Sequence, residues 1–172
     1  MSNLTEVLQP ETVHTPMKDD QVSFFTKNSP LSNFYSSPFT YQGDKFTCME
    51  QHIQAKKAAL FKDAETGINI MAETKQEIQK QLSKNINGYD QTEWYSKAFD
   101  LILPALIEKY RQNPVCKTLL LSTGNRAIVE ASPYDSFWGA GCALSDPKLW
   151  SKEWDGRNMM GKALEKVRES LK

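Results

Sequence analysis

The chain has 172 residues, of which 40% are hydrophobic and 24% charged, as in a globular protein large enough to bury a core without disulfides. Its 21 basic and 21 acidic residues balance, which argues against a protein that holds nucleic acid mainly by neutralising phosphates but leaves room for a local phosphate pocket. Two histidines and three cysteines, none in a CxxC pair, make a Ser-His-Asp triad, an HExxH site or a zinc ribbon hard to build. Acid–base chemistry would then depend on carboxylates, lysine or tyrosine.

Residues 1–20 are polar and lack a hydrophobic period, which predicts a flexible N-terminal arm in front of a domain over residues 21–172. The arm has no positive segment followed by an apolar core, so it does not resemble a signal peptide. No apolar run in the chain approaches the ~20 residues that a membrane span needs. We therefore expect a cytoplasmic protein that does not associate with membranes.

Short strands and several helices are predicted after the arm. The run VSFF from Val22 predicts a strand, and two aromatic-rich runs around a turn at Gly43 and Asp44 predict a β-hairpin. Helical patterns cover residues 48–62, 64–71, 75–83, 93–112 and 158–172. Pro104 predicts a kink or a restart in the fourth of these helices. Residues 117–131 favour strand, turn and strand, with a helix followed by a strand as the alternative, and residues 132–150 read as a long loop.

The helix predicted over residues 48–62 carries charges on its apolar face. At about 100° per residue, Glu50, Gln54 and Lys57 share that face. The opposite side, expected to face solvent, carries Gln51, His52, Lys56 and Lys62. Charged groups on a core-facing stripe are costly unless they are paired or used in chemistry. Two structural alternatives remain: Glu50 closes a capping box with Thr47, or Glu50 and Lys57 form an ion pair.

The loop over residues 135–141 combines a carboxylate, a tryptophan and glycines. Asp135 is a candidate base or a ligand for a ribose hydroxyl, and Trp138 offers a stacking surface. Gly139 would let backbone amides approach a ligand phosphate. The alternative is a turn with a packed tryptophan, in which Asp135 caps its own backbone.

An earlier loop, predicted over residues 27–39, offers a second set of ligand groups. Asn33 can recognise an amide edge or a hydroxyl, and Phe34 or Tyr35 can stack on a ring. The alternative is a plain loop with two aromatic core residues. Trp94, at the start of the helix expected over 93–112, is likewise either a ligand platform or a core residue.

Six segments, taken in order, carry a resemblance to a known family. They are SPLSNFYSSPF, FTCMEQHIQAKKA, Trp94, LLSTG, VEASPYDSFWGAG and WDGRNMMGKAL. Together they resemble the NADAR family, named for NAD and ADP-ribose, whose bacterial YbiA-like members are N-glycosidases. The match covers nearly the whole chain after the arm.

The resemblance implies an α+β fold: a predominantly helical single domain with a few short strands or hairpins. It also implies hydrolysis of the N-glycosidic bond between ribose, or ADP-ribose, and an amine-bearing base. Known family substrates are ADP-ribose on the guanine amino group and phosphorylated early intermediates of riboflavin synthesis. The implied site contains Asn33, Glu50, Lys57, Trp94, Asp135, Trp138 and Asn158, to which the residue patterns add Phe34, Gln54 and Gly139.

Among these, Glu50, Lys57 and Asp135 are the expected catalytic residues, and the others are expected to bind substrate. Lys56 stands directly before Lys57, but the helical phase favours Lys57. We expect no metal and no cofactor, and no stable protein partner. The expected partner is an ADP-ribose-containing or ribose-phosphate small molecule, or an ADP-ribosylated nucleic acid base. The alternative is a non-catalytic sensor or sink that binds NAD or ADP-ribose, although phosphate binding alone does not require the carboxylate of Glu50.

Overall fold

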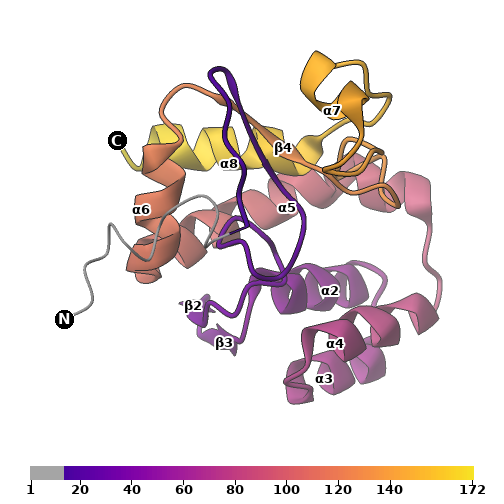
Figure 1. Cartoon of the computed structure of the whole chain (residues 1–172). Coiled ribbons are helices and arrows are strands. Elements are labelled where there is room, and N and C mark those ends of the chain that lie inside the picture. The colour runs from indigo at the N-terminus through magenta and orange to yellow at the C-terminus, as the bar shows by residue number, and fades with distance from the viewer. Residues whose placement is uncertain (1–13) are drawn as a thin grey trace. The chain divides into compact units, whose positions relative to one another are not determined.

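The structure is a computed structural model that describes residues 14–172, and within them the chain forms two compact units (Figure 1). The helical unit comprises residues 36–113, and the sheet unit combines residues 14–35 with residues 114–172. Helices account for most of the regular structure, and four short strands complete it among the described residues. The predominantly helical α+β class expected from the sequence is confirmed.

The sheet unit contains a parallel pair of strands, β1 (Gln21–Phe24) and β4 (Ala127–Glu130). All four residues of β1 are buried, which confirms the strand expected from Val22. Helix α8 (Met159–Ser170) packs on β4 and buries an apolar stripe, as its sequence period predicts. A further cluster of buried residues joins β4, the loop after it and the helix over residues 147–151, and it includes Val129, Ala140 and Leu149.

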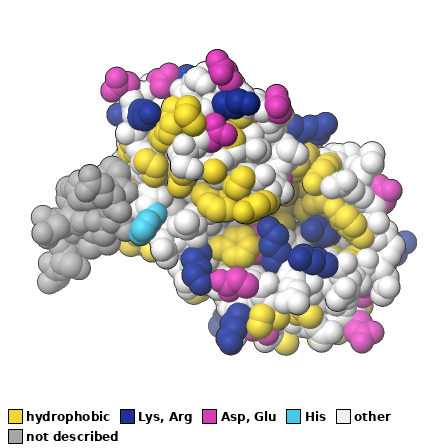
Figure 2. Space-filling view, turned by 45° about the vertical axis from the view of Figure 1, so that its right-hand side comes forward, with side chains coloured by type: hydrophobic (Ala, Val, Ile, Leu, Met, Phe, Trp, Pro, Cys, Tyr) yellow, Lys and Arg dark blue, Asp and Glu magenta, His cyan; other side chains and the backbone are white. Residues whose placement is uncertain are grey.

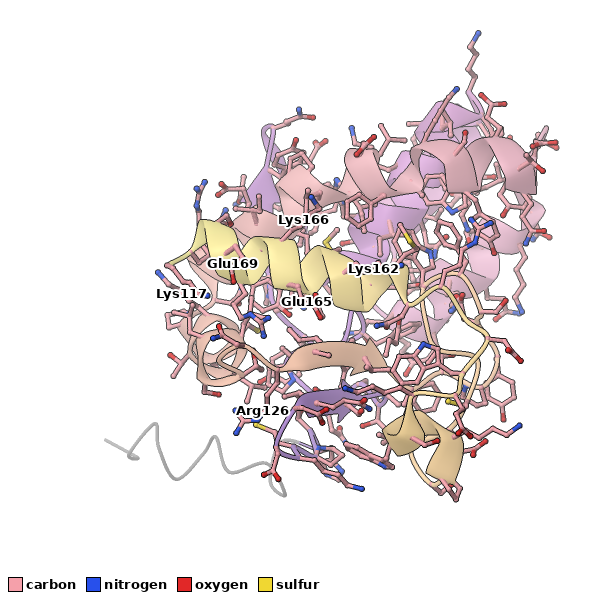
Figure 3. The ribbon with its side chains drawn as sticks, turned by 90° about the horizontal axis from the view of Figure 1, so that it is seen from above. Lys117, Arg126, Lys162, Glu165, Lys166 and Glu169 are labelled. Atoms are coloured by element: carbon pink, nitrogen blue, oxygen red, sulfur yellow. The ribbon has the colours of Figure 1, made fainter. Side chains whose placement is uncertain are left out.

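Side chains of α8 close the outer edge of β4. The Ile128 amide donates to Glu165 Oε1 at 2.9 Å, and the Glu130 amide donates to Asn158 Oδ1 at 3.0 Å. Asn158 Nδ2 in turn donates to the Ile128 carbonyl at 2.8 Å. A two-stranded sheet leaves backbone groups unpaired at its edges, and such groups need partners when buried. Figure 3 shows Glu165 on the side of α8 that faces β4, while Lys162, Lys166 and Glu169 follow the same helix.

The segment before β4 is helical, so the strand–turn–strand prediction for residues 117–131 is wrong and the helix–strand alternative is right. Helix α6 (Pro114–Ser122) begins at a proline, which suits the first helical turn because its missing N–H is not needed there. Cys116, Leu119 and Leu120 are buried at helical spacing. The turn after α6 contains Gly124 with a φ of 62°. A short run of leucines fits either structure, and packing decides between them.

Part of the expected N-terminal arm is attached to the sheet unit. Residues 1–13 lie outside the described residues, so the arm stays a prediction there. Thr15 is buried, and its hydroxyl is 2.7 Å from that of Ser29. Met17 forms an antiparallel bridge with Val22. The boundary between arm and domain was expected at residue 20, but the residues just before it, Thr15 and Met17, already contact the sheet unit.

The helical unit begins with the expected β-hairpin, formed by β2 (Phe39–Tyr41) and β3 (Asp44–Phe46). Its two-residue turn is Gln42-Gly43, with φ angles of 52° and 91°. Two successive positive φ angles are typical of the turns that match the twist of a hairpin. Asp44, expected in the turn, is the first residue of β3 instead.

The helical predictions over residues 48–112 are confirmed, with small shifts at their ends. The helices are α2 (Met49–Leu60), α3 (Ala64–Ala72), α4 (Gln76–Leu82), the 3₁₀ turn η1 (Ser83–Asn85) and α5 (Gln91–Gln112). Helix α5 runs unbroken through Pro104, whose side chain is exposed. The loop expected over residues 132–150 also holds a short helix, α7 (Pro147–Ser151), in the sheet unit.

Helix α2 is the centre of the helical unit, so the expected solvent-facing side is wrong for Gln51 and His52, whereas Lys56 is partly exposed and Lys62 exposed, as expected. It packs against α3, α4, α5 and β3. Gln51 and His52 are each only 1% exposed, because α3 and the hairpin cover that side of the helix. Gln51 satisfies its buried amide by donating to the carbonyls of Ile70, Met71 and Glu73.

No helix within residues 14–172 is both long and apolar enough to cross a membrane. On the face shown in Figure 2, basic and acidic side chains are interspersed, with hydrophobic side chains among them. This mixture agrees with the equal numbers of basic and acidic residues in the sequence.

Candidate active site

Glu50 and Gln54 form a buried polar pair on α2. Both residues are only 4% exposed, and Gln54 Nε2 donates a hydrogen bond to Glu50 Oε1 at 2.7 Å. Their spacing of four residues brings the side chains together on one face of the helix. Gln54 Oε1 is buried and has no hydrogen-bond partner among the described residues. The pair therefore holds one carboxylate oxygen in place and leaves an amide acceptor open to a further donor.

The capping-box alternative for Glu50 is wrong. Cys48 is the N-cap of α2, and its side chain makes no capping hydrogen bond. The Thr47 amide donates instead to Gln51 Oε1 at 2.8 Å, and the Thr47 hydroxyl donates to the same oxygen at 3.2 Å. Gln51 thus serves the segment before the helix, and Glu50 lies buried on another face.

Lys57 lies against aromatic rings one helical turn further along this face. Its Nζ is 5.3 Å from the centroid of the Tyr89 ring and 5.5 Å from that of Trp94. Both distances fall within the range in which a ring face attracts a cation, about 6 Å. Trp94 is 1% exposed, so it is a core residue and also a wall for Lys57. Tyr89 was not predicted from the sequence; its position just after the Asn87-Gly88 turn carries only a weak signal.

Lys109 is a second residue at this site that was not predicted from the sequence. It is fully buried in α5, with Nζ 5.0 Å from the centroid of the Tyr110 ring. Burial raises the pKa of the Cys48 thiol; the charge of Glu50 raises it further, while the charge of Lys109 lowers it. A carboxylate and an ammonium therefore both act on the same buried thiol. Lys109 could have been predicted in the same way as Glu50, because it is a charged residue on the apolar stripe of a helix.

In the sheet unit, Asp135 binds its own loop. Its Oδ1 accepts from the amides of Phe137 at 2.9 Å and Trp138 at 2.8 Å. This is the geometry of an aspartate turn, as the structural alternative for this loop expected. A catalytic role for Asp135 stays a prediction.

Trp138 and Gly139 follow directly. Trp138 is partly buried, with its ring edge-on to Phe137 at 4.9 Å between centroids. A Cβ on Gly139 would lie 2.9 Å from the carbonyl oxygens of Asp135 and Glu130, closer than real side chains approach. Glycine is therefore required here by neighbouring backbone, whatever its role toward a ligand phosphate.

Asn158 connects this loop to α8 and β4. Its amide donates to the Gly139 carbonyl at 3.0 Å, and its φ of 49° is one that asparagine tolerates better than most residues. Both ends of its side chain are bonded to the edge of β4. These bonds give Asn158 a structural role, and a contact with substrate stays a prediction.

Asn33 presents a buried acceptor in the earlier loop of the same unit. The residue is 6% exposed, and its Oδ1 has no hydrogen-bond partner among residues 14–172. A buried oxygen without a partner is costly and calls for an explanation. Phe34 is partly buried, and its amide donates to the Ser32 hydroxyl at 3.1 Å.

The helical unit therefore brings together four predicted site residues, Glu50, Gln54, Lys57 and Trp94. The sheet unit holds the other six, Asn33, Phe34, Asp135, Trp138, Gly139 and Asn158, and it links the last four through one loop and the start of α8. Over the described part of the chain, no group of three or more histidine, cysteine or acidic side chains could hold a metal ion.

The model of the NADAR domain matches residues 19–172. The chain belongs to the NADAR family. This NADAR chain is 36% identical over 166 residues to N-glycosidase R617 of Acanthamoeba polyphaga mimivirus, a match that covers 89% of this chain and 98% of that protein. It is 28% identical over 141 residues to riboflavin biosynthesis protein VVA0006 of Vibrio vulnificus (strain YJ016), covering 82% of this chain and 35% of that protein.

A solved structure shares the fold of the NADAR chain. The NMR structure of the E. coli protein YbiA matches with a TM-score of 0.73 at 22% identity, covering 95% of this chain and 92% of YbiA. The resemblance noted from the six sequence segments is therefore confirmed at the level of family and fold.

Proposed function

We propose that this NADAR protein is an N-glycosidase that hydrolyses the bond between ribose, or ADP-ribose, and an amine-bearing base. The observation that carries the proposal is the face of α2 on which buried Glu50 is bonded to Gln54, with Lys57 held near two aromatic rings. A carboxylate and an amine on one face are the groups that this hydrolysis needs. The names of the relatives, N-glycosidase and riboflavin biosynthesis protein, support the same reaction class.

The reaction breaks the bond between C1′ of the ribose and the nitrogen of the base. The electron pair leaves with the nitrogen, which takes a proton, and the oxygen of a water molecule bonds to C1′ and gives up a proton. Positive charge develops on the sugar in the transition state, and a nearby carboxylate stabilises it. We assign that role to Glu50, whose oxygen Gln54 holds in place before substrate binds.

Lys57 is proposed to serve the leaving group. The faces of Tyr89 and Trp94 attract an ammonium and so position the head group of Lys57, which would give a proton to the leaving amine. A second route is available to lysine, the capture of the opened sugar aldehyde as a Schiff base. Reduction with borohydride during turnover separates the two, because only the Schiff base becomes a stable covalent adduct.

Residues of the sheet unit are proposed to bind the substrate. Asn33 Oδ1 would accept a hydrogen bond from an amide or hydroxyl, and Trp138 would stack on a ring. The other proposed binding residues are Phe34, Gly139 and Asn158, and Asp135 would shape the loop that carries Trp138. The substrate classes are ADP-ribose on the amino group of guanine and phosphorylated riboflavin precursors.

The test is incubation of the purified protein with ADP-ribosylated guanosine. Multiple turnovers that release guanosine and free ADP-ribose support the enzyme. Stoichiometric retention of intact ligand supports the alternative, a sensor or sink. Because Glu50 and Lys57 supply the charge stabilisation and the proton, we propose that no metal is needed, and turnover should survive treatment with EDTA.

A further inference from the structure

Arg157, in the sheet unit, is an arginine whose guanidinium the fold does not use. The chain has four arginines, and all of them are described. Arg111 pairs with Glu108, and Arg126 and Arg168 donate to backbone carbonyls. The side chain of Arg157 is exposed and makes no hydrogen bond or ion pair with any residue from 14 to 172. Its five N–H donors are therefore available to a ligand.

The backbone of Arg157 is fixed along the loop that carries Trp138. The Arg157 amide donates to the Ser136 carbonyl at 2.7 Å, and the Met160 amide donates to the Trp138 carbonyl at 3.0 Å. The Gly156 amide extends this pairing, since it donates to the Ala140 carbonyl at 3.1 Å. Residues 156–160 therefore follow residues 136–140, and the position of Arg157 beside the loop is set before any ligand binds.

The guanidinium of Arg157 lies over an aromatic ring. Its Cζ is 5.7 Å from the centroid of the Phe137 ring, within the range in which a ring face attracts a cation, about 6 Å. Phe137 in turn meets the ring of Trp138 edge-on. A ring face holds a cation without accepting all of its N–H groups, as a carboxylate would. The loop therefore presents a cation close to the surface on which the substrate is proposed to stack.

The start of α8 does not offer the usual alternative for binding an anion. A helix start holds phosphate through the free amides of its first turn. The first two amides of α8, those of Met159 and Met160, donate instead to carbonyls of the loop, at 3.0 Å each. These donors are not available to a phosphate, so the guanidinium of Arg157 is the better placed group.

We infer that Arg157 binds a phosphate group of the substrate and thereby selects phosphorylated ribosides. The inference rests on the proposed function, whose two substrate classes both carry phosphate. The planar fork of a guanidinium matches two phosphate oxygens, and charge-assisted hydrogen bonds of this kind are strong. A riboside without phosphate would lose this contact but keep the stacking surface of Trp138. Arg157 is a binding and specificity residue in this account, and it takes no part in breaking the bond.

The test measures the binding of ADP-ribose, ribose 5-phosphate and adenosine to the full chain by calorimetry. Arg157→Met keeps an apolar stem beside Phe137 but has no donor, so it should weaken ADP-ribose tenfold or more and leave adenosine within twofold. Arg157→Lys keeps the charge without the planar fork, and its loss should be intermediate. Arg111→Met makes the same change at an exposed ion pair of α5 and should leave all three probes within twofold.

The third probe identifies the phosphate that Arg157 binds. A similar loss for ribose 5-phosphate in Arg157→Met would support the inference and assign Arg157 to a phosphate monoester. A loss confined to ADP-ribose would support it and assign Arg157 to the pyrophosphate.

Two outcomes would overturn the inference. Equal ADP-ribose affinity in Arg157→Met and the unmodified protein, or no binding by either, would show that the guanidinium stays in solvent. An equal loss for adenosine and ADP-ribose, with a lower melting temperature, would show that Arg157 only supports the Phe137 ring. Because binding is measured, the effect of Arg157→Met should persist in a Glu50→Gln background. A failure of the proposed hydrolysis is thus distinguishable from a failure of this inference.

Discussion

Glu50 in the helical unit and Asp135 in the sheet unit are both carboxylates that the sequence identified as catalytic candidates, but the fold uses them differently. Glu50 accepts from the side chain of Gln54, four residues away on the same helix. Asp135 accepts from two backbone amides within its own turn. A carboxylate bonded to backbone fixes a loop, and its removal changes the fold first. A carboxylate held by another side chain can keep that partner while it acts on a substrate.

The same contrast separates the polar neighbours of the two carboxylates. Gln54 has an open acceptor, whereas both ends of the Asn158 side chain are bonded to β4. We therefore expect changes on α2 to affect turnover, and changes at the residues bonded to backbone, Asp135 and Asn158, to affect stability.

Lys57→Met should cause the largest loss. Methionine keeps an unbranched apolar stem, one atom shorter than that of lysine, beside Tyr89 and Trp94, but it lacks the proton and the charge. We expect turnover to fall at least ~100-fold with the fold intact, equivalent to about 2.7 kcal/mol of transition-state stabilisation. Lys56→Met is the matched control and should stay active. A dead Lys56→Met beside an active Lys57→Met would contradict the assigned helical face.

Asn158→Ala should lower stability instead. It removes both hydrogen bonds to β4 and places alanine at a φ of 49°, so the free energy of unfolding should fall by about 2–4 kcal/mol. Asn158→Gly loses the same bonds without the backbone strain and should be less destabilised. Thermal or urea unfolding measures both. Unchanged stability with a loss of ligand affinity would assign Asn158 to substrate after all.

Trp138→Ala tests whether the sheet-unit loop also binds ligand. Stacking of a base on an aromatic ring is worth about 1–3 kcal/mol, so affinity for ADP-ribose should fall about tenfold or more. Binding should also change tryptophan emission less in the variant than in the parent. A collapse of the melting temperature would show that the partly buried ring is a packing residue.

The smallest effect is expected at the N-terminus. Deletion of residues 1–13 should leave turnover within a few-fold. Deletion of residues 1–20 should leave turnover similar but lower the melting temperature, because it removes the Thr15–Ser29 hydrogen bond and the bridge from Met17 to Val22. A loss of turnover of a hundredfold or more with the shorter deletion would show that the arm takes part in catalysis.

Local patterns predicted the parts of the fold that local rules control. The hairpin, the helix around Glu50 and the stripe of α8 follow from residue spacing alone. The burial of the second side of α2 could not be predicted in this way. Polar residues such as His52 look solvent-facing on an isolated helix, but α3 and the hairpin cover them. The leucines of α6 fit a strand equally well until their packing is known.

The sequence predicted which residue types the candidate site contains better than it predicted what each residue does. Charges on an apolar face indicated Glu50 and Lys57, and the same reasoning applied to α5 would have found Lys109. The backbone partners of Asp135 and Asn158 could not be read in advance. The bonds of Asn158 join it to a strand about 30 residues away, and no local pattern encodes such a contact.

The most direct test compares Glu50→Gln with Asp135→Asn in one experiment, measuring turnover of ADP-ribosylated guanosine and melting temperature for each. Both changes keep the size of the side chain and remove its charge. Glu50→Gln should lose at least ~100-fold in turnover with little change in melting temperature. Asp135→Asn keeps an Oδ1 that can accept from the amides of Phe137 and Trp138, so it should keep turnover within about tenfold and melt only slightly earlier, because hydrogen bonds to a neutral oxygen are weaker. Full turnover in Glu50→Gln together with a dead, stable Asp135→Asn would contradict the assignment of the chemistry to α2.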